Sequence, residues 1–134
     1  DLLIKNTSIQ NRFEIWFVPL QIHSLERGGE SAQQRQLGYI RELIADYRHV
    51  VLMGDMNAHA EQLLTRTPLK ETDLIPLPDT AHSFPSWRPE KALDHILVSP
   101  SLEIRRSEVV SYPVSDHLPI AMDVALPKGY LQTF

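Results

Sequence analysis

Three short motifs carry residues whose types and spacing could perform acid–base or metal chemistry. The residues are Asp55 and Asn57 in Gly54-Asp55-Met56-Asn57, Asp94 in Leu93-Asp94-His95-Ile96-Leu97, and the pair in Ser115-Asp116-His117-Leu118-Pro119. Each motif follows, opens or precedes an apolar, strand-like run. A fold that gathers the ends of these strands would pool three carboxylates, one amide and one imidazole. Such a set could bind a hard divalent cation and hydrolyse a phosphoester.

Asp55 and Asn57 come just after the apolar run 50–53. In an extended backbone, residues i and i+2 point to the same side, so the carboxylate and the amide would face one pocket. Mg²⁺ takes oxygen ligands and keeps waters that a substrate phosphate can displace. A calcium-binding EF-hand loop is excluded, because its sixth position would be Ala60 rather than Gly and its twelfth would be Arg66 rather than Glu. A turn capped by Asp and Asn is an equal alternative to a site.

Asp94 lies within an apolar strand, where a carboxylate is costly to bury without a partner. A histidine partner would offset that cost and fix the imidazole tautomer, whereas the alternative is a strand-end Asp that faces water. In the Asp116-His117 pair, the carboxylate could bind metal while the imidazole exchanges protons or donates to a phosphoryl oxygen. The alternative for this pair is a turn at the entry of a strand, with Asp116 as a local cap.

Other polar and aromatic residues are candidates for contacts at the mouth of a pocket. His23 ends the first predicted strand, and His82 and Trp87 lie in Ala81-His82-Ser83-Phe84-Pro85-Ser86-Trp87. Trp87 could stack on a base or sugar of a substrate, with core packing or loop anchoring as the alternative. We assign Trp87, Arg88 and His82 to substrate binding. The remaining histidines are weaker candidates: His49, His59 and His95.

The elements that must position these residues follow from hydrophobic periodicity. Leu37, Ile40, Ile44 and Tyr47 recur at helical spacing and predict an amphipathic helix over 31–48, with a capping box formed by Ser31 and Gln34. A strand buried on both faces is predicted over 50–53, a buried strand over 93–98 and a short helix over 58–66. Further strands are predicted over 12–22, 104–112 and 118–126, and the proline-rich segment 67–90 should be mostly irregular. These elements predict a layered α/β or α+β domain.

Composition is that of one globular domain. The chain has 134 residues, 43% of them hydrophobic and 22% charged, and carries a net charge of −4. That charge disfavours a broad nucleic-acid footprint. A local basic patch could use Arg88, Lys91, Arg105 and Arg106, with scattered surface charge as the alternative. Absence of cysteine excludes disulfides and thiolate metal sites. Because neither a run of about 20 apolar residues nor a secretory signal is visible, we expect a cytoplasmic protein without a transmembrane segment.

Taken in order, the motifs resemble the endonuclease/exonuclease/phosphatase (DNase I-like) superfamily. The match is carried by 51–57, by Ser86-Trp87-Arg88-Pro89, by 93–99 and by 115–119, and it extends from about residue 13 to 126. Ile22-His23-Ser24 is similar to the family's strand-ending Thr-His-Leu, with departures on either side of the His, and 33–36 fits the helix that follows. The resemblance implies half of a four-layer α/β sandwich, in which helices cover one face of a sheet.

The resemblance also implies roles. Asp55 would bind or orient the attacking water and help to bind Mg²⁺ or Mn²⁺, and Asn57 would position the water and the phosphate. Asp116 would help to bind the metal. His117 would contact the scissile phosphate, with Asp94 orienting its imidazole, and His23 would add a phosphate contact. The reaction would be in-line attack of water on a phosphoester, most simply a phosphodiester.

Family catalytic domains are roughly twice this length, so residues 1–134 match the C-terminal half. The N-terminal half supplies an Asn and a metal-binding Glu in the family. We therefore expect weak or no activity from the chain alone, and a sheet face that a missing N-terminal half or a second copy must cover. Two alternatives stay open: a non-catalytic half-domain that pairs through this face, and a nuclease. Net charge does not favour nucleic acid as the substrate.

Overall fold

An amphipathic helix, α1 (Gly29–Ile44), opens the described part of the computed structural model, which comprises residues 29–77 and 82–125. Gln33, Leu37 and Ile40 lie on one face of α1 at helical spacing and are buried. The helix begins before Ser31, so the predicted capping box is wrong. It also ends four residues before the predicted position 48, because the chain turns there and the Tyr47 N–H donates to the Ile44 carbonyl at 3.1 Å.

Three antiparallel strands form the central sheet, in the order β1-β3-β2. They are β1 (Val51–Asp55), β3 (Asp94–Val98) and the short β2 (Ile75–Pro76). Residues 95–98 of β3 are all buried, as predicted, whereas in β1 only Leu52 is buried and the others are half-buried. The expectation that β1 is buried on both faces is therefore wrong. The register pairs the last residue of β1, Asp55, with the first residue of β3, Asp94.

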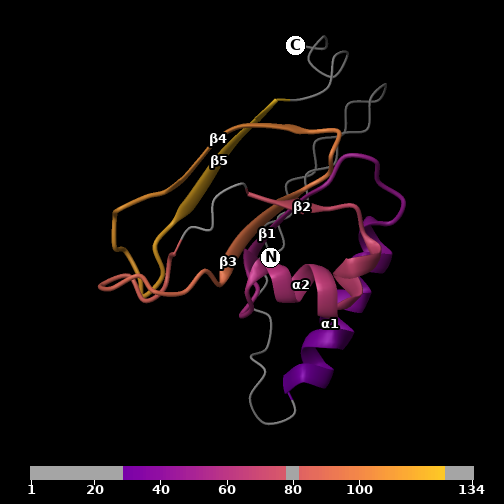
Figure 1. Ribbon diagram of the computed structural model, residues 1–134, viewed down its shortest axis with the longest axis horizontal. Helices are drawn as coiled ribbons and strands as arrows, with labels where there is room; N and C mark the ends of the chain where they lie inside the picture. The colour runs from indigo at the N-terminus through magenta and orange to yellow at the C-terminus, as the bar shows by residue number, and fades with distance from the viewer. Residues whose placement is uncertain (1–28, 78–81, 126–134) are drawn as a thin grey trace.

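Helices cover one face of this sheet. The side chains of Leu52 and Leu97, which are cross-strand partners, join a buried cluster with Leu37 of α1, Leu63 of α2 (Ala60–Arg66) and Leu69 of the 3₁₀ helix η1 (Pro68–Glu71). Helix α2 confirms the short helix predicted over 58–66. Figure 1 shows α1 and α2 together on the same side of the strands. The α+β class, with helices on one face of a sheet, is confirmed.

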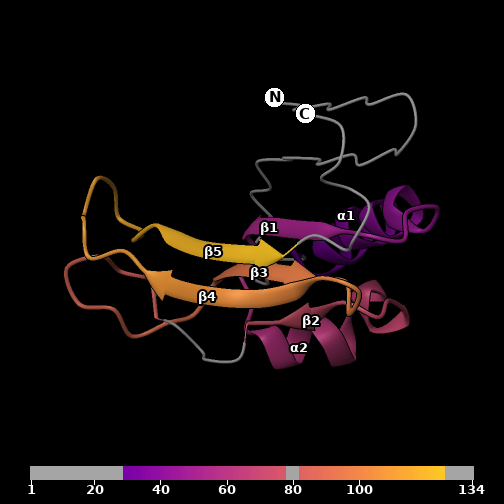
Figure 2. The same ribbon diagram turned by 90° about the horizontal axis from the view of Figure 1, so that it is seen from above.

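A two-stranded antiparallel sheet lies on the other side of β3. It consists of β4 (Glu103–Val109) and β5 (Ile120–Ala125), and β5 contacts β3. Figures 1 and 2 show this pair across the central sheet from the helices. The loop 110–119 between β4 and β5 returns to the end of the central sheet where β3 begins. It thereby brings His117 close to Asp94.

Further sequence predictions concern the proline-rich segment 67–90, the strand over 12–22 and membrane-spanning helices. The described parts of the segment 67–90, residues 67–77 and 82–90, are mostly irregular, as the prolines predict, apart from η1, β2 and a bridge between Phe84 and Lys91. The strand predicted over 12–22 and His23 lie outside the described residues. Within the described ranges, no helix is long and apolar enough to cross a membrane.

Candidate active site

Three of the predicted side chains meet where β1 ends and β3 begins. Asp94 Oδ2 lies 2.7 Å from Nδ1 of His117, and Asp55 Oδ2 lies 3.7 Å from Nε2 of the same ring. The antiparallel register places the two aspartates opposite each other. The loop 110–119 places the imidazole of His117 within reach of both. All three side chains are partly exposed, between 13% and 25%, so the group is held by the protein yet open to a ligand.

The loop after β1 is a side-chain-capped turn as well as part of this group. Asp55 Oδ1 accepts the backbone N–H of Asn57 at 2.9 Å, which is the hydrogen bond of an Asx turn. Asn57 has a φ of 48°, in the left-handed region that Asn tolerates better than most residues. The expectation that Asp55 and Asn57 share a face of extended backbone is therefore wrong. The turn is confirmed, and it does not exclude a site, because the other carboxylate oxygen of Asp55 faces His117.

The loop that carries His117 is capped by Ser115. Its Oγ accepts the His117 N–H at 3.1 Å and lies 3.0 Å from the His117 carbonyl oxygen, to which it donates. Asp116 was the residue predicted to cap this turn, but Ser115 provides the cap. The ring of Phe84 packs on the imidazole, with 4.6 Å between the ring centroids. The imidazole is thus fixed from its backbone, from one ring face and through Nδ1.

The charges in the group act on one another. Burial raises the pKa of Asp55, the Asn57 N–H lowers it, and the neighbouring carboxylates of Asp94 and Asp116 raise it further. Burial lowers the pKa of His117, but the hydrogen bond to Asp94 and the surrounding carboxylates outweigh burial and raise it. A carboxyl group with a raised pKa next to an imidazolium-stabilising carboxylate is an arrangement typical of proton-transfer sites.

Buried polar side chains support the group through hydrogen bonds. Sequence patterns did not predict this supporting role. Ser83 Oγ donates to Asp94 Oδ2 at 2.5 Å. Gln33 of α1 donates through Nε2 to the Met56 carbonyl at 3.2 Å, and His95 bonds the Ala58 carbonyl through Nε2 at 2.6 Å. Burial lowers the pKa of His95, although the Ala58 carbonyl opposes this, so the neutral ring that donates one N–H is favoured. The bonds of Gln33 and His95 fix the loop that carries Asp55 and Asn57.

Other residues predicted for the site stand apart from the group. Asp116 is exposed, but its charge acts on both Asp55 and His117. His82 is exposed. Trp87 is 76% exposed, so the core-packing alternative for it is wrong. Arg88 is exposed and pairs with Glu90 at 2.8 Å. The structure brings together Asp55, Asp94 and His117 and leaves the substrate-binding candidates on the surrounding loop.

Three of the four basic residues proposed as a local patch are paired with carboxylates. In addition to the Arg88 pair, Arg105 lies 3.5 Å from Glu103 and Arg106 lies 3.5 Å from Glu108, all on β4. Each of these three arginines therefore faces a carboxylate two residues away. This arrangement fits the alternative of scattered surface charge.

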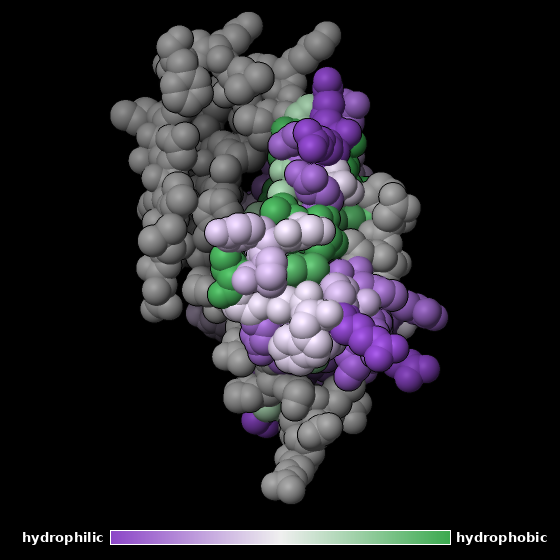
Figure 3. All heavy atoms as spheres, turned by 90° about the vertical axis from the view of Figure 1, so that its left-hand side faces the viewer, coloured by the Kyte–Doolittle hydropathy of each residue, from purple (hydrophilic) through white to green (hydrophobic). Residues whose placement is uncertain are grey.

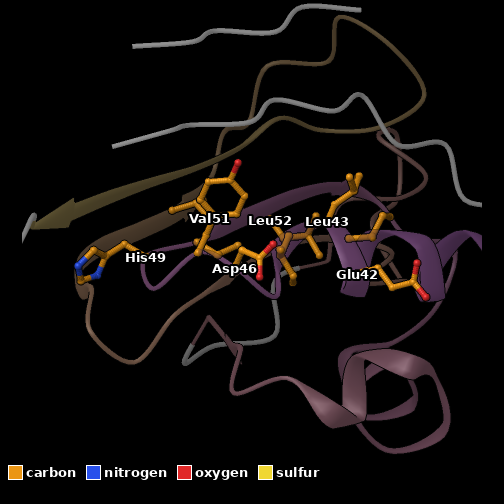
Figure 4. A pocket seen from close by; sticks show the side chains of 10 residues that line it. Glu42, Leu43, Asp46, His49, Val51 and Leu52 are labelled. Atoms are coloured by element: carbon orange, nitrogen blue, oxygen red, sulfur yellow. The ribbon is translucent and has the colours of Figure 1, made fainter. Parts of the chain in front are cut away.

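A cavity of about 310 Å³ lies away from the group. It is lined by the end of α1 and the start of β1, with Leu43, Val51 and Leu52 on its wall and Glu42, Asp46 and His49 around it (Figure 4). No member of the Asp55–Asp94–His117 group lines it. The geometry of the polar side chains, rather than this cavity, locates the candidate site.

The donor atoms fit a hard cation in part. One ligand atom each from Asp55, Asp94 and His117 lies within 4.8 Å of the others, so the three could hold a metal ion. Asp94 Oδ2 and His117 Nδ1 are already bonded to each other, whereas Asp55 Oδ2 is more loosely held. Burial and then repulsion by Asp94 and Asp116 raise the pKa of Asp55, and a cation would offset both effects. Asp55 is therefore the member of the group whose carboxylate is most available to a cation, and the charge of Asp116 also acts on Asp55.

Comparisons with known proteins give a family and a fold. The family model described as "Endonuclease/Exonuclease/phosphatase family" matches residues 6–117. No match is found among curated proteins. A mannosyl-6-phosphatase from Bacteroides thetaiotaomicron is similar in structure, with a TM-score of 0.59 and 20% identity; the match covers 86% of this chain and 52% of that one.

Two further solved structures are described as endonuclease/exonuclease/phosphatase proteins. The one from Bacteroides vulgatus has a TM-score of 0.57 and 24% identity, over 74% of this chain and 46% of that one. The one from Beutenbergia cavernae has a TM-score of 0.60 and 21% identity, over 78% and 34%. At these identities the likeness concerns the fold. The chain spans about half, or less, of the length of the solved structures that it matches.

Proposed function

This chain belongs to the endonuclease/exonuclease/phosphatase family, and from that premise we propose that it forms part of a divalent-metal-dependent phosphohydrolase that cleaves phosphodiesters. The observation that carries the proposal is the contact of His117 with Asp94 beside the carboxylate of Asp55. This set has the three functions that hydrolysis needs: a base for water, a donor for the phosphoryl oxygens, and carboxylate oxygens for a cation.

In the proposed reaction, a water oxygen bonds to phosphorus while the bond from phosphorus to the leaving alkoxide breaks in line. Asp55 orients the water and accepts its proton, a role that its raised pKa favours. Asn57 positions the water and the phosphate. His117 donates from Nε2 to a phosphoryl oxygen, because Asp94 accepts from Nδ1 and stabilises the imidazolium. His23, outside the described residues, would contact the phosphate as well.

Asp55 and Asp116 are the residues that would hold the cation in this proposal, as Mg²⁺ or Mn²⁺. When bound, it would neutralise charge on the phosphoryl oxygens. Because the chain spans about half the length of its structural relatives, we propose that the rest of a family domain supplies the remaining ligands and covers the sheet. A second copy of the chain is the alternative partner for that surface.

The proposal is tested by hydrolysis of bis(p-nitrophenyl) phosphate with Mg²⁺, Mn²⁺ or EDTA. We expect metal-dependent turnover from protein that contains both halves of the family domain, loss of turnover in Asp116→Ala, and weak or no turnover from the chain alone. Turnover of p-nitrophenyl phosphate in place of the diester would assign a monoesterase, a class for which the sugar-phosphatase relative is the motivation. We refer to protein that contains both halves of the family domain as the two-half protein. If this protein is folded and hydrolyses neither ester under any metal condition, the proposal is contradicted.

Trp87 is the best candidate for binding the organic part of the substrate. Trp87 follows Ser86, whose N–H donates to the Asp116 carbonyl at 2.8 Å. The backbone that carries the indole is therefore tied to the loop of His117. Exposed apolar side chains at Trp87, Tyr112 and Val114 belong to this end of the molecule. Figure 3 shows hydrophobic side chains bordered by hydrophilic ones on the face that lies at the left of Figure 1. A flat ring on the substrate could stack on such a surface.

We expect Trp87→Ala to raise KM for bis(p-nitrophenyl) phosphate about tenfold, equivalent to about 1.4 kcal/mol and within the range of aromatic stacking. Thermal stability should not change, because the side chain is 76% exposed. Methyl p-nitrophenyl phosphate, which lacks the second ring, should show a smaller effect. Tyr39→Ala removes a comparably exposed ring from α1 and serves as the matched control. An unchanged KM in Trp87→Ala would exclude stacking.

A further inference from the structure

Ser83 is a fully buried residue whose polar groups join the two segments that meet in the site. Its side chain is 0% exposed. The backbone N–H donates to the Lys91 carbonyl at 3.0 Å, and the carbonyl accepts the N–H of Leu118, the residue after His117, at 2.7 Å. The hydroxyl donates to Asp94 at 2.5 Å. One residue therefore bonds the backbone of the His117 loop and the side chain of Asp94.

Both bonds to the Asp94 carboxylate converge on the same atom. Oδ2 accepts from Ser83 Oγ and from His117 Nδ1. A carboxylate held by the imidazole alone could turn about its Cβ–Cγ bond and present either oxygen. A second donor, fixed in a buried position, removes that freedom and sets the direction from which the imidazole is held.

The neighbouring residue adds to this arrangement. Phe84 follows Ser83 directly and packs its ring against the imidazole of His117. The position of the Ser83 backbone therefore determines where the phenyl ring lies, while the Ser83 hydroxyl determines where the carboxylate lies. The imidazole is held between these two contacts, which originate from consecutive residues.

We infer that Ser83 is a positioning residue for hydrolysis, acting through Asp94 to hold the His117 imidazole with its Nδ1–H on Asp94 and its Nε2–H directed at the phosphoryl oxygen. This inference rests on the proposed function of the site. Ser83 itself contacts neither the substrate nor a cation in this arrangement, so its effect is on the rate of the chemical step rather than on binding.

The test compares Ser83→Ala with Ser99→Ala. Ser99 is a matched control, because it is also buried, at 2%, and its Oγ accepts the Val50 N–H at 2.8 Å at the far end of β3. In the two-half protein, Ser83→Ala should lower kcat about tenfold or more with KM unchanged, the range seen when an outer hydrogen-bond partner is removed. Ser99→Ala should leave kcat unchanged. Ser83→Thr, which keeps the hydroxyl, should restore kcat.

A second readout does not depend on activity. At alkaline pH, where the ring is neutral, imidazole ¹⁵N shifts of this chain report which nitrogen of His117 carries the proton. We expect the Nδ1–H form in the wild type and in Ser99→Ala, and a mixture of tautomers in Ser83→Ala. A wild-type tautomer ratio in Ser83→Ala would overturn the inference, even if kcat fell through lost stability. An inactive wild type with the expected shift in tautomers would count against the proposed function alone.

Discussion

Replacement of His117 by Ala should lower kcat for phosphoester hydrolysis about 10²–10⁴-fold, the range for a positioned proton donor. The imidazole lies between the carboxylates of Asp55 and Asp94, and Asp94 holds it at 2.7 Å. Its removal deletes the donor that would stabilise charge developing on the phosphoryl oxygens. Steady-state kinetics of the two-half protein, with KM and kcat separated, measure the effect. The loss should appear in kcat.

A double variant tests whether His117 and Asp94 act as one unit. If Asp94 acts by holding the imidazole, the double variant His117→Ala/Asp94→Asn should be no slower than His117→Ala alone, because residues that act as a unit give non-additive losses. His49→Ala is the matched control, since this histidine bonds Ser101 at 2.6 Å at the opposite end of β1. Additive losses in the double variant would show that Asp94 has a separate role and that the contact with His117 is incidental.

The site was predictable where a polar residue interrupts an apolar pattern. Asp94 was singled out because a carboxylate beside 96–98 needs a partner, and the structure supplies His117. Asp55 stood out because it ends an apolar run, and β1 does end there. For Asp94 the signal was the free-energy cost of burying a charge without a partner, and for Asp55 it was an oxygen ligand placed directly after an apolar run.

The supporting contacts were not predictable for a different reason. Ser83 lies in a proline-rich segment without periodicity, and its bond to Asp94 depends on how the 82–93 loop folds back on itself. Gln33 looked like an ordinary polar residue of an amphipathic helix, yet it is buried and bonds Met56, 23 residues away. The left-handed Asn57 was missed because the apolar run before it suggested that extended backbone would continue. Each depends on tertiary contacts that local pattern does not encode.

For Trp87 the structure removes one of the two alternatives to substrate binding, namely core packing. Burial is the usual expectation for an indole, but this one is 76% exposed on the loop that also carries Ser86. A short loop tied by backbone bonds to the loop 110–119 leaves its tip facing solvent. Where an aromatic residue is exposed beside a cluster of titratable groups, binding is a better hypothesis than packing.

Binding of a divalent cation should stabilise the folded chain through Asp55. We expect Mg²⁺ or Mn²⁺ to raise the melting temperature of this chain and Asp55→Asn to lose that rise, because the carboxylate of Asp55 is the one in the group most available to a cation. At 100 times the dissociation constant, a ligand stabilises the native state by about 2.7 kcal/mol. Thermal melts across a metal titration, with EDTA as the baseline, measure the effect. Hydrolysis by the two-half protein should be lost in the same variant.

Asp55→Asn should remove the metal-induced rise in melting temperature without destabilising the metal-free protein. Asparagine keeps the Oδ1 that accepts the Asn57 N–H, so the turn after β1 should persist. Because burial and then the charges of Asp94 and Asp116 raise the pKa of Asp55, removal of its charge should leave metal-free stability unchanged or increased. Asp73→Asn, an exposed substitution before β2, is the control and should keep the metal-induced rise. Stabilisation by metal that is equal in wild type and Asp55→Asn would show that the cation binds elsewhere, and the assignment of Asp55 as a ligand would then be wrong.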